Sequence, residues 1–154
     1  MIIIEDTRNQ IGKHKTLNET LRSMGIKVIR SKLYVGDYSR LDNQTVCIDT
    51  KKDWLELVTN LTKQHQRFRD ECLRAKESQI KLFVLVEQNI PAYRWKSPVK
   101  RNGKAISQVK GEVLQKIMNT MKEKYDVEFI YCDKKQTAQR LLELLGGKDE
   151  GKNN

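Results

Sequence analysis

The chain is 154 residues long, a length that fits one folded domain with a buried core. Its composition, 38% hydrophobic and 32% charged, is typical of a soluble globular protein and excludes a disordered chain. The formal net charge of +10 favours a polyanionic partner, with nucleic acid ahead of an anionic membrane surface. No run of about 18 apolar residues is present, so we expect no transmembrane helix and no membrane partner.

Apolar runs and helical spacings alternate along the chain. Strands are predicted over residues 2–5, 26–29, 33–35, 46–48, 80–86 and 127–132. Helices are predicted over residues 13–24, 54–61, 63–77, 111–125 and 136–145. The alternation indicates an α/β fold with a central mixed β-sheet flanked by helices. We expect one domain over residues 1–147 and a disordered tail over 148–154.

The stretch 33–51 carries the main chemical signal, because two short apolar runs are joined by a polar turn. In this prediction Asp37 follows the first strand and Asp49 ends the second. Side chains alternate along a strand, so Asp49 and Lys51 should share one face while Thr50 points away. Two carboxylates and one ammonium group would then meet at an edge of the sheet.

These groups suit a divalent metal ion that acts on a phosphate. Mg²⁺ prefers oxygen ligands, commonly one or two carboxylates together with the substrate phosphate. A lysine beside a metal-bound water can orient that water and offset the charge of the phosphate. An Asp, a spacer and then Asp-x-Lys is the pattern of the PD-(D/E)xK nucleases. A hairpin with solvated charges explains the same residues, so both interpretations stay open at this point.

Several strings, taken in order, resemble the XPF/Hef-type structure-specific endonuclease domain, which is a branch of the PD-(D/E)xK nucleases. Residues 4–8 (IEDTR) resemble its V-D-x-R-E opening, and residues 33–38 (LYVGDY) resemble its L-x-x-G-D-Y. Residues 47–51 (CIDTK) lie where the family has V-E-R-K. Residues 64–71 fall where it has a helix of R-F-x-x-E character, and residues 80–87 resemble its L-L-I-E strand. In order and spacing the resemblance covers nearly the whole chain.

The resemblance implies a restriction-endonuclease-like fold and a Mg²⁺-dependent DNA endonuclease acting on branched or nicked DNA. Asp37, Asp49 and Lys51 would be the catalytic residues. Asp37 and Asp49 would hold one or two Mg²⁺ ions, for which Mn²⁺ can substitute. Asp6 and the carbonyl of Thr50 would help to bind the metal, although a turn-capping role also explains Asp6.

The chain also departs from the family pattern. Asp49 replaces the glutamate of E-R-K, Thr50 replaces its arginine, and Leu55 stands where an aspartate follows. Asn9 replaces the glutamate of V-D-x-R-E. The missing arginine supports an alternative, a catalytically weak DNA-binding module that acts with a partner protein, and a homodimer is a further possibility. The departures also fit a stand-alone phage or bacterial branch.

Candidate DNA contacts lie in two regions and at Arg8. The segment 88–111 has no acid and carries several cations interleaved with Tyr93 and Trp95, which could stack on unpaired bases. Its candidates are Arg94, Trp95, Lys96, Lys100, Arg101 and Lys104. The second region is the charged helix, with His65, Arg67 and Arg69. A solvated loop whose tryptophan packs on the core also explains the first region, but the overall positive charge favours contact with DNA.

Three further expectations concern residues outside these sets. His14 is expected to be a surface or helix residue rather than a ligand, and Glu71 is expected to be solvated or paired with a lysine one turn away. Cys47, Cys72 and Cys132 are far apart and odd in number, which fits buried thiols better than disulfides or a zinc site. We therefore expect a cytoplasmic protein, in a prokaryotic or phage-infected cell if the phage or bacterial branch is correct.

Overall fold

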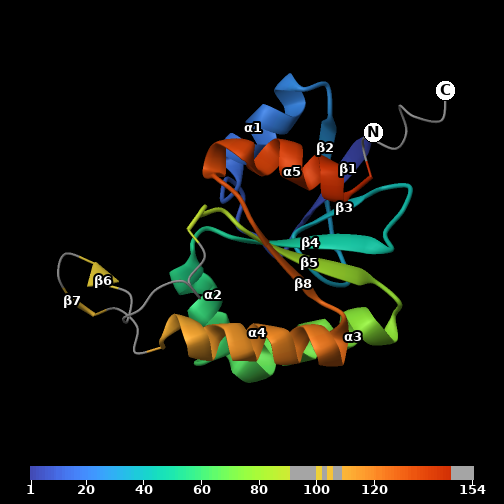
Figure 1. Cartoon of the computed structure of the whole chain (residues 1–154). Coiled ribbons are helices and arrows are strands. Elements are labelled where there is room, and N and C mark those ends of the chain that lie inside the picture. The colour runs from blue at the N-terminus through green and yellow to red at the C-terminus, as the bar shows by residue number, and fades with distance from the viewer. Residues whose placement is uncertain (91–99, 102–103, 106–108, 147–154) are drawn as a thin grey trace.

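A six-stranded sheet passes through the middle of the molecule in the order β2-β1-β3-β4-β5-β8 (Figure 1). The structure is a computed structural model that describes residues 1–90, 100–101, 104–105 and 109–146. The strands are β1 (Ile2–Asp6), β2 (Lys27–Ser31), β3 (Tyr38–Arg40), β4 (Val46–Lys51), β5 (Lys81–Val86) and β8 (Glu128–Tyr131). Only β3 runs antiparallel to its neighbours in this sheet, so the predicted mixed sheet is confirmed.

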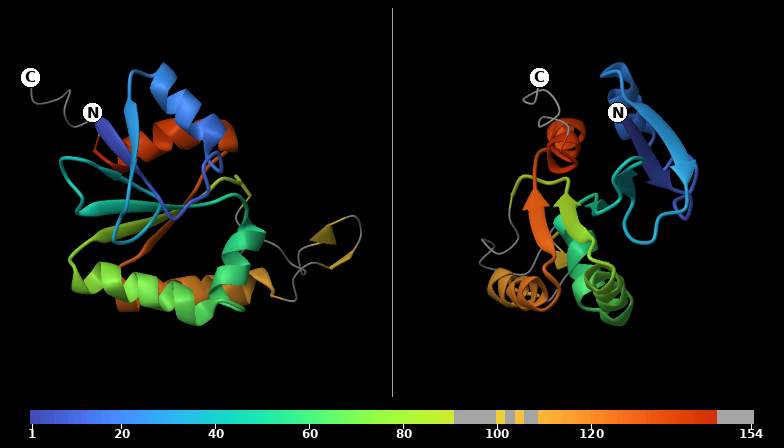
Figure 2. Two further views of the ribbon diagram at one scale, coloured as in Figure 1. Left: turned by 180° about the vertical axis from the view of Figure 1, so that it is seen from behind. Right: turned by 90° about the vertical axis from the view of Figure 1, so that its right-hand side faces the viewer.

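Helices cover both faces of the sheet (Figure 2). The helices α1 (Lys15–Ser23) and α5 (Thr137–Leu144) lie together on one side, and a short 3-10 turn, η2 (Lys134–Gln136), leads into α5. On the other side lie α2 (Trp54–Leu61), α3 (His65–Glu77) and α4 (Gly111–Tyr125). This arrangement confirms the predicted α/β class. No helix within the described residues is long and apolar enough to cross a membrane.

The two faces of the central strands are both buried, which explains their nearly continuous apolar sequence. In β5, Val84 packs in the core under α3 and α4, while Leu85 packs in the core under α1 and α5. Cys47 and Ile48 divide in the same way in β4. All three cysteines are buried and free, as expected from their spacing.

The strand predicted over residues 33–35 is wrong. These residues are irregular, and the strand that pairs with β4 is β3, which begins after Gly36 and Asp37. Asp37 therefore precedes its strand, and Asp49 lies inside β4 rather than at its end. The backbone of this segment is held by side chains, since the amide of Leu33 donates to Oδ1 of Asp6 at 2.8 Å. Local apolar pattern does not encode such a contact.

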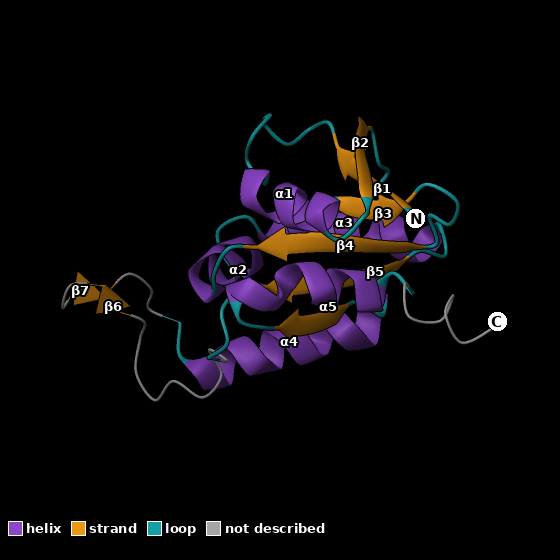
Figure 3. Ribbon diagram, turned by 90° about the horizontal axis from the view of Figure 1, so that it is seen from above, coloured by secondary structure: helices purple, strands orange, loops and turns teal. Residues whose placement is uncertain are grey.

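Two short strands, β6 (Lys100–Arg101) and β7 (Lys104–Ala105), form a separate antiparallel hairpin away from the main sheet (Figure 3). They lie in the basic segment predicted to contact DNA. Of that segment, Arg94, Trp95 and Lys96 lie outside the described residues, as do the side chains of Lys100, Arg101 and Lys104. The predicted disordered tail over 148–154 also lies outside them.

Gly36 permits the backbone before Asp37 to turn and to pass close to β4. Its φ is +77°, in the left-handed region, and a Cβ there would lie 3.0 Å from the carbonyl oxygen of Ile48. The contact is with the β4 backbone, which cannot move without distorting the sheet. Glycine is therefore required at this position for two reasons, conformation and space.

We predict that Gly36→Ala lowers the free energy of unfolding by about 2–3 kcal/mol, because strain and a backbone clash add. Gly25→Ala is the matched control, since Gly25 has a φ of +83° but no atom within 4 Å of an added Cβ. It should cost only about 1 kcal/mol. Urea unfolding of both variants measures the difference, and equal losses would contradict the role given to the close contact with β4.

Candidate functional site

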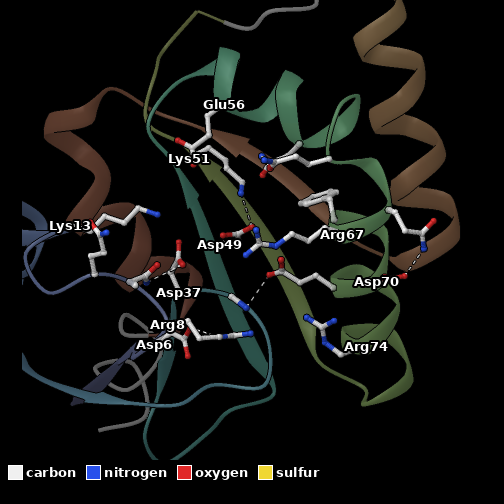
Figure 4. Close-up of a pocket in the computed structure, with 18 residues that line it drawn as sticks. Asp6, Arg8, Lys13, Asp37, Asp49, Lys51, Glu56, Arg67, Asp70 and Arg74 are labelled. Carbon is white, nitrogen blue, oxygen red and sulfur yellow. Dashed lines mark hydrogen bonds and ion pairs between the residues drawn. The ribbon is translucent and has the colours of Figure 1, made fainter.

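A cavity of about 890 Å³ lies between the end of β4 and the helix α3 (Figure 4). The end of β1 contributes Asp6 to its lining, the loop that follows contributes Arg8 and Lys13, and β4 contributes Asp49 and Lys51. The segment before β3 contributes Gly36 and Asp37, and α2 contributes Glu56 and Asn60. The helix α3 contributes Arg67, Asp70, Glu71 and Arg74. The structure thus brings the predicted catalytic set, Asp37, Asp49 and Lys51, into one cavity.

Asp37 is fixed from two sides. Its Oδ2 accepts hydrogen bonds from the amide and the hydroxyl of Thr50, at 2.9 and 2.8 Å, and its Oδ1 accepts one from Asn9 at 3.1 Å. Burial alone would raise the pKa of Asp37, but these donors and the nearby His14 hold it below the ordinary value. Asp37 is therefore an ionised carboxylate with a fixed orientation.

The hydroxyl of Thr50 is itself held by a histidine whose side chain is largely covered. Its oxygen lies 3.1 Å from Nε2 of His14, and Nδ1 of His14 lies 3.1 Å from Oε2 of Glu5. Because the hydroxyl donates its single hydrogen to Asp37, it can only accept from His14. The side chain of His14 is only 9% exposed, so of the two expected positions the surface is wrong, and His14 lies at the start of α1.

Asp49 and Lys51 form the other half of the site. Nζ of Lys51 lies 3.1 Å from Oδ2 of Asp49, which confirms that the two side chains share one face of β4. Oδ2 is buried, yet it accepts no hydrogen bond from any described residue, and the lysine contact lacks hydrogen-bond geometry. A buried oxygen of this kind is costly unless a further group meets it.

The charges in the cavity perturb one another. Burial and the neighbouring Glu71 raise the pKa of Asp49 well above its ordinary value, despite the nearby Lys51. Burial alone would lower the pKa of Lys51, but the negative charge of Asp49 outweighs it and raises that pKa. Lys51 thus stays an ammonium group, and the mutual repulsion of the acids is relieved by the raised pKa of Asp49.

Glu71 is a member of the site that sequence analysis missed. Its Oε1 accepts a hydrogen bond from the amide of Gly36 at 3.1 Å, so the side chain reaches across from α3 to the segment that carries Asp37. Glu71 forms no ion pair with a lysine among the described residues, and it is half-buried rather than fully solvated. A signal was present, because Glu71 lies three residues after Phe68 and next to Cys72, at the edge of the inward stripe of α3.

The remaining predicted residues take different places. Asp6 lines the cavity, but its two oxygens accept from the amide of Leu33 and from Nε of Arg8, an arrangement that favours the turn-capping alternative. Arg67 lines the cavity, whereas His65 and Arg69 are exposed on α3 outside its lining. Within the described residues, no three His, Cys, Asp or Glu side chains form a ready-made metal cluster. The carbonyl of Thr50 as a metal ligand stays a prediction.

Comparison with known proteins gives one family and one fold. The family model described as the ERCC4 domain matches residues 5–145. XPF from Aeropyrum pernix is similar in structure, with a TM-score of 0.66 and 20% identity over 94% of this chain and 63% of that one. XPF from Aeropyrum pernix in complex with DNA gives a TM-score of 0.68 and 20% identity, over 97% of this chain and 66% of that one. No curated protein sequence matches the chain.

The structural likeness confirms the predicted restriction-endonuclease-like fold, and the family match confirms the resemblance on which the site residues were chosen. The chain spans less than two thirds of the length of the XPF chains that it matches, 63% and 66%.

The raised pKa of Asp49 predicts an unusual pH dependence of stability. Between the ordinary value of 3.8 and its raised value, folded Asp49 keeps a proton that the unfolded chain has released. The contribution of Asp49 to the stability of the metal-free protein must therefore fall as pH rises through this window. Asp37 behaves in the opposite way, because its pKa is lowered. The stability that ionised Asp37 contributes is lost only as pH falls below about 3.8, so it does not overlap with the effect of Asp49, which lies above that pH.

We predict that Asp49→Asn raises the melting temperature of the metal-free protein, and that the gain over wild type grows as pH rises from about 4 towards neutrality. Thermal melts in EDTA across this pH range measure it. Glu77→Gln is the control for removal of one negative charge, since Glu77 is exposed on α3 outside the cavity's lining. A difference from wild type that does not change with pH would contradict the assigned shift.

Proposed function

Because this chain belongs to the ERCC4 domain family, we propose that it is a metal-dependent DNA endonuclease that hydrolyses phosphodiester bonds at branched or nicked DNA. The observation that supports this proposal most is the meeting of Asp37, Asp49 and Lys51 in one cavity, where Oδ2 of Asp49 has no hydrogen bond from a described residue. Two carboxylates beside one ammonium group suit a site that must bind both a cation and a phosphate.

The donor set fits a hard divalent cation. Asp37 and Asp49 offer carboxylate oxygens, and Mg²⁺ favours such ligands in small number because it retains water and takes substrate phosphate oxygens. We propose Mg²⁺ as the metal, with Mn²⁺ able to replace it. A metal ion held there would activate a water for attack and stabilise the leaving oxygen.

The protein's own residues would divide the remaining work. Thr50 and Asn9 hold Asp37 in one orientation, so that its position is set before substrate arrives. The ammonium of Lys51 would orient the attacking water and offset the charge that develops on the phosphate. Arg67 and Arg74 line the same cavity from α3 and would bind phosphates on either side of the cleaved bond.

The basic segment is proposed as a second DNA contact. It includes the β6–β7 hairpin and the cations at Arg94, Lys96, Lys100 and Arg101. Its charges have no acid between Glu87 and Glu112 to offset them. One solved relative in fold is described as XPF in complex with DNA, and we extend DNA binding to this chain as part of the proposal.

The alternative is a nuclease-like module that binds DNA and leaves efficient cleavage to a partner subunit or to a second copy. Thr50 favours it, because the family resemblance places an arginine there and the threonine hydroxyl is occupied by Asp37 and His14. Cleavage by the purified chain alone separates the two functions.

We predict that Asp49→Asn and Lys51→Ala each reduce cleavage of a flap substrate about 100-fold or more, because each removes several kcal/mol of transition-state stabilisation. Binding of the same DNA in Ca²⁺, which suppresses cutting, should survive in both. Glu77→Gln and Lys52→Ala are the matched controls, since both side chains are exposed and outside the cavity's lining. Near wild-type cleavage by both site variants would contradict the assignment.

A second prediction concerns the cations at the cavity. Arg67→Ser combined with Arg74→Ser should weaken DNA binding and flatten the slope of log affinity against log salt by about 0.9 for each duplex phosphate that the variant no longer neutralises. A salt titration in Ca²⁺ measures the slope. Arg22→Ser combined with Lys27→Ser serves as the control, because both residues are exposed and outside the cavity's lining. An unchanged slope in the site variant would show that the α3 arginines do not bind phosphate.

A further inference from the structure

Three acids of the cavity, Asp37, Asp49 and Glu71, lie around one buried lysine, Lys51. Asp37 and Asp49 are buried, with 8% and 6% of their surface exposed, and Glu71 is partly buried beside them. Burial and Asp37 raise the pKa of Glu71, as burial and Glu71 raise the pKa of Asp49, which places the three acids within electrostatic reach of one another. Within the described part of the chain, the ion pair of Lys51 with Asp49 is the only one that any of the three acids forms. Arg67 and Arg74 line the same cavity but form no ion pair with any of these acids among the described residues.

The position of Glu71 is fixed by the same turn that carries Asp37. Its Oε1 accepts from the amide of Gly36, the residue directly before Asp37. Its second oxygen accepts no hydrogen bond from a described residue, which leaves it available to a solvent molecule or ligand in the cavity that it lines. Asp49 lines the same cavity, and its Oδ2 is likewise without a hydrogen bond from the described residues.

We propose that Glu71 is the third carboxylate of the metal site and acts through water, by accepting a hydrogen bond from a water bound to the cation that Asp37 and Asp49 hold. This inference rests on the proposed function and names the part that α3 plays in it. Contact through water fits the finding that no three acids among the described residues are close enough to hold one ion directly. Mg²⁺ keeps several waters in protein sites, and partners of such ligands are a regular part of metal sites.

Glu71 also connects the metal to the substrate. Arg67 and Arg74 lie one turn away from it on the same helix and line the same cavity. Occupation of the metal site would therefore set the position of the helix face that carries both arginines. Glu71 is accordingly a positioning residue, since it reaches the cation only through water.

Isothermal titration calorimetry with Mn²⁺ alone measures the affinity of the protein for the metal, and it tests the inference without any measure of activity. Glu71→Gln keeps the oxygen that accepts from Gly36 and removes only the charge. We expect it to weaken Mn²⁺ binding about 10–100-fold, as removal of an outer partner does. We also expect it to raise the melting temperature in EDTA, because repulsion among the acids is relieved. Glu77→Gln, an exposed neutralisation on the same helix, should change neither quantity.

Two outcomes would overturn the inference: Mn²⁺ affinity unchanged in Glu71→Gln, or weaker binding accompanied by a lower metal-free melting temperature, which would show a purely structural role. Asp49→Asn separates this failure from that of the proposed function. If Asp49→Asn loses Mn²⁺ binding while Glu71→Gln retains it, the metal site stands and only the role of Glu71 fails. If the wild type binds no Mn²⁺, both proposals fail.

Discussion

Hydrogen bonds between β4 and the segment before β3 hold the two aspartates of the site in place. The amide of Asp37 donates to the carbonyl of Ile48 at 2.7 Å, and Thr50 returns two hydrogen bonds to the side chain of Asp37. Asp49 lies between Ile48 and Thr50 on the same strand, so its separation from Asp37 is set by the geometry of the sheet. The conformation of Gly36 makes this close approach of two backbones possible.

Because side chains alternate along β4, its residues contribute to the site from two faces of the sheet. Asp49 and Lys51 face the cavity, while Thr50 and His14 secure Asp37 from the other side. Thr50 thus takes a structural part where the family resemblance places a guanidinium. We propose that the arginines of α3 bind the phosphate that this guanidinium would otherwise bind, because Arg67 and Arg74 line the cavity that Thr50 does not.

The fold was largely predictable because its signals are local. The run Ile80–Val86 is apolar apart from Lys81 and becomes a central strand buried on both faces, and the spacing of Trp54, Leu57, Val58 and Leu61 places one face of α2 in the core. Alternation alone placed Asp49 and Lys51 on one face. The interpretation of residues 33–51 as two strands joined by a turn had already placed Asp37 near them, although the first of those strands is irregular, and the family resemblance supported the same choice.

The errors share a physical cause, which is contact between residues far apart in sequence. Residues 33–35 are apolar because Leu33 and Val35 are buried, but the backbone here is held by side chains instead of by a neighbouring strand. Asp6 of β1 accepts from the amide of Leu33, and Glu71 of α3 accepts from the amide of Gly36. His14 is held by Glu5 and Thr50, whose positions relative to it depend on the complete sheet. Glu71 was identifiable in part from the inward stripe of α3, although its partner Gly36 was not.

The central claim is that the chain by itself cleaves DNA through a divalent metal held by Asp37 and Asp49. Incubation of the purified chain with flap, fork, Holliday-junction and plain duplex DNA, each with Mg²⁺, Mn²⁺ or EDTA, tests this most directly. We predict cleavage of at least one branched substrate with either metal and none in EDTA. Cleavage that persists in EDTA, or no cleavage of any substrate with either metal while DNA is still bound, would contradict the claim.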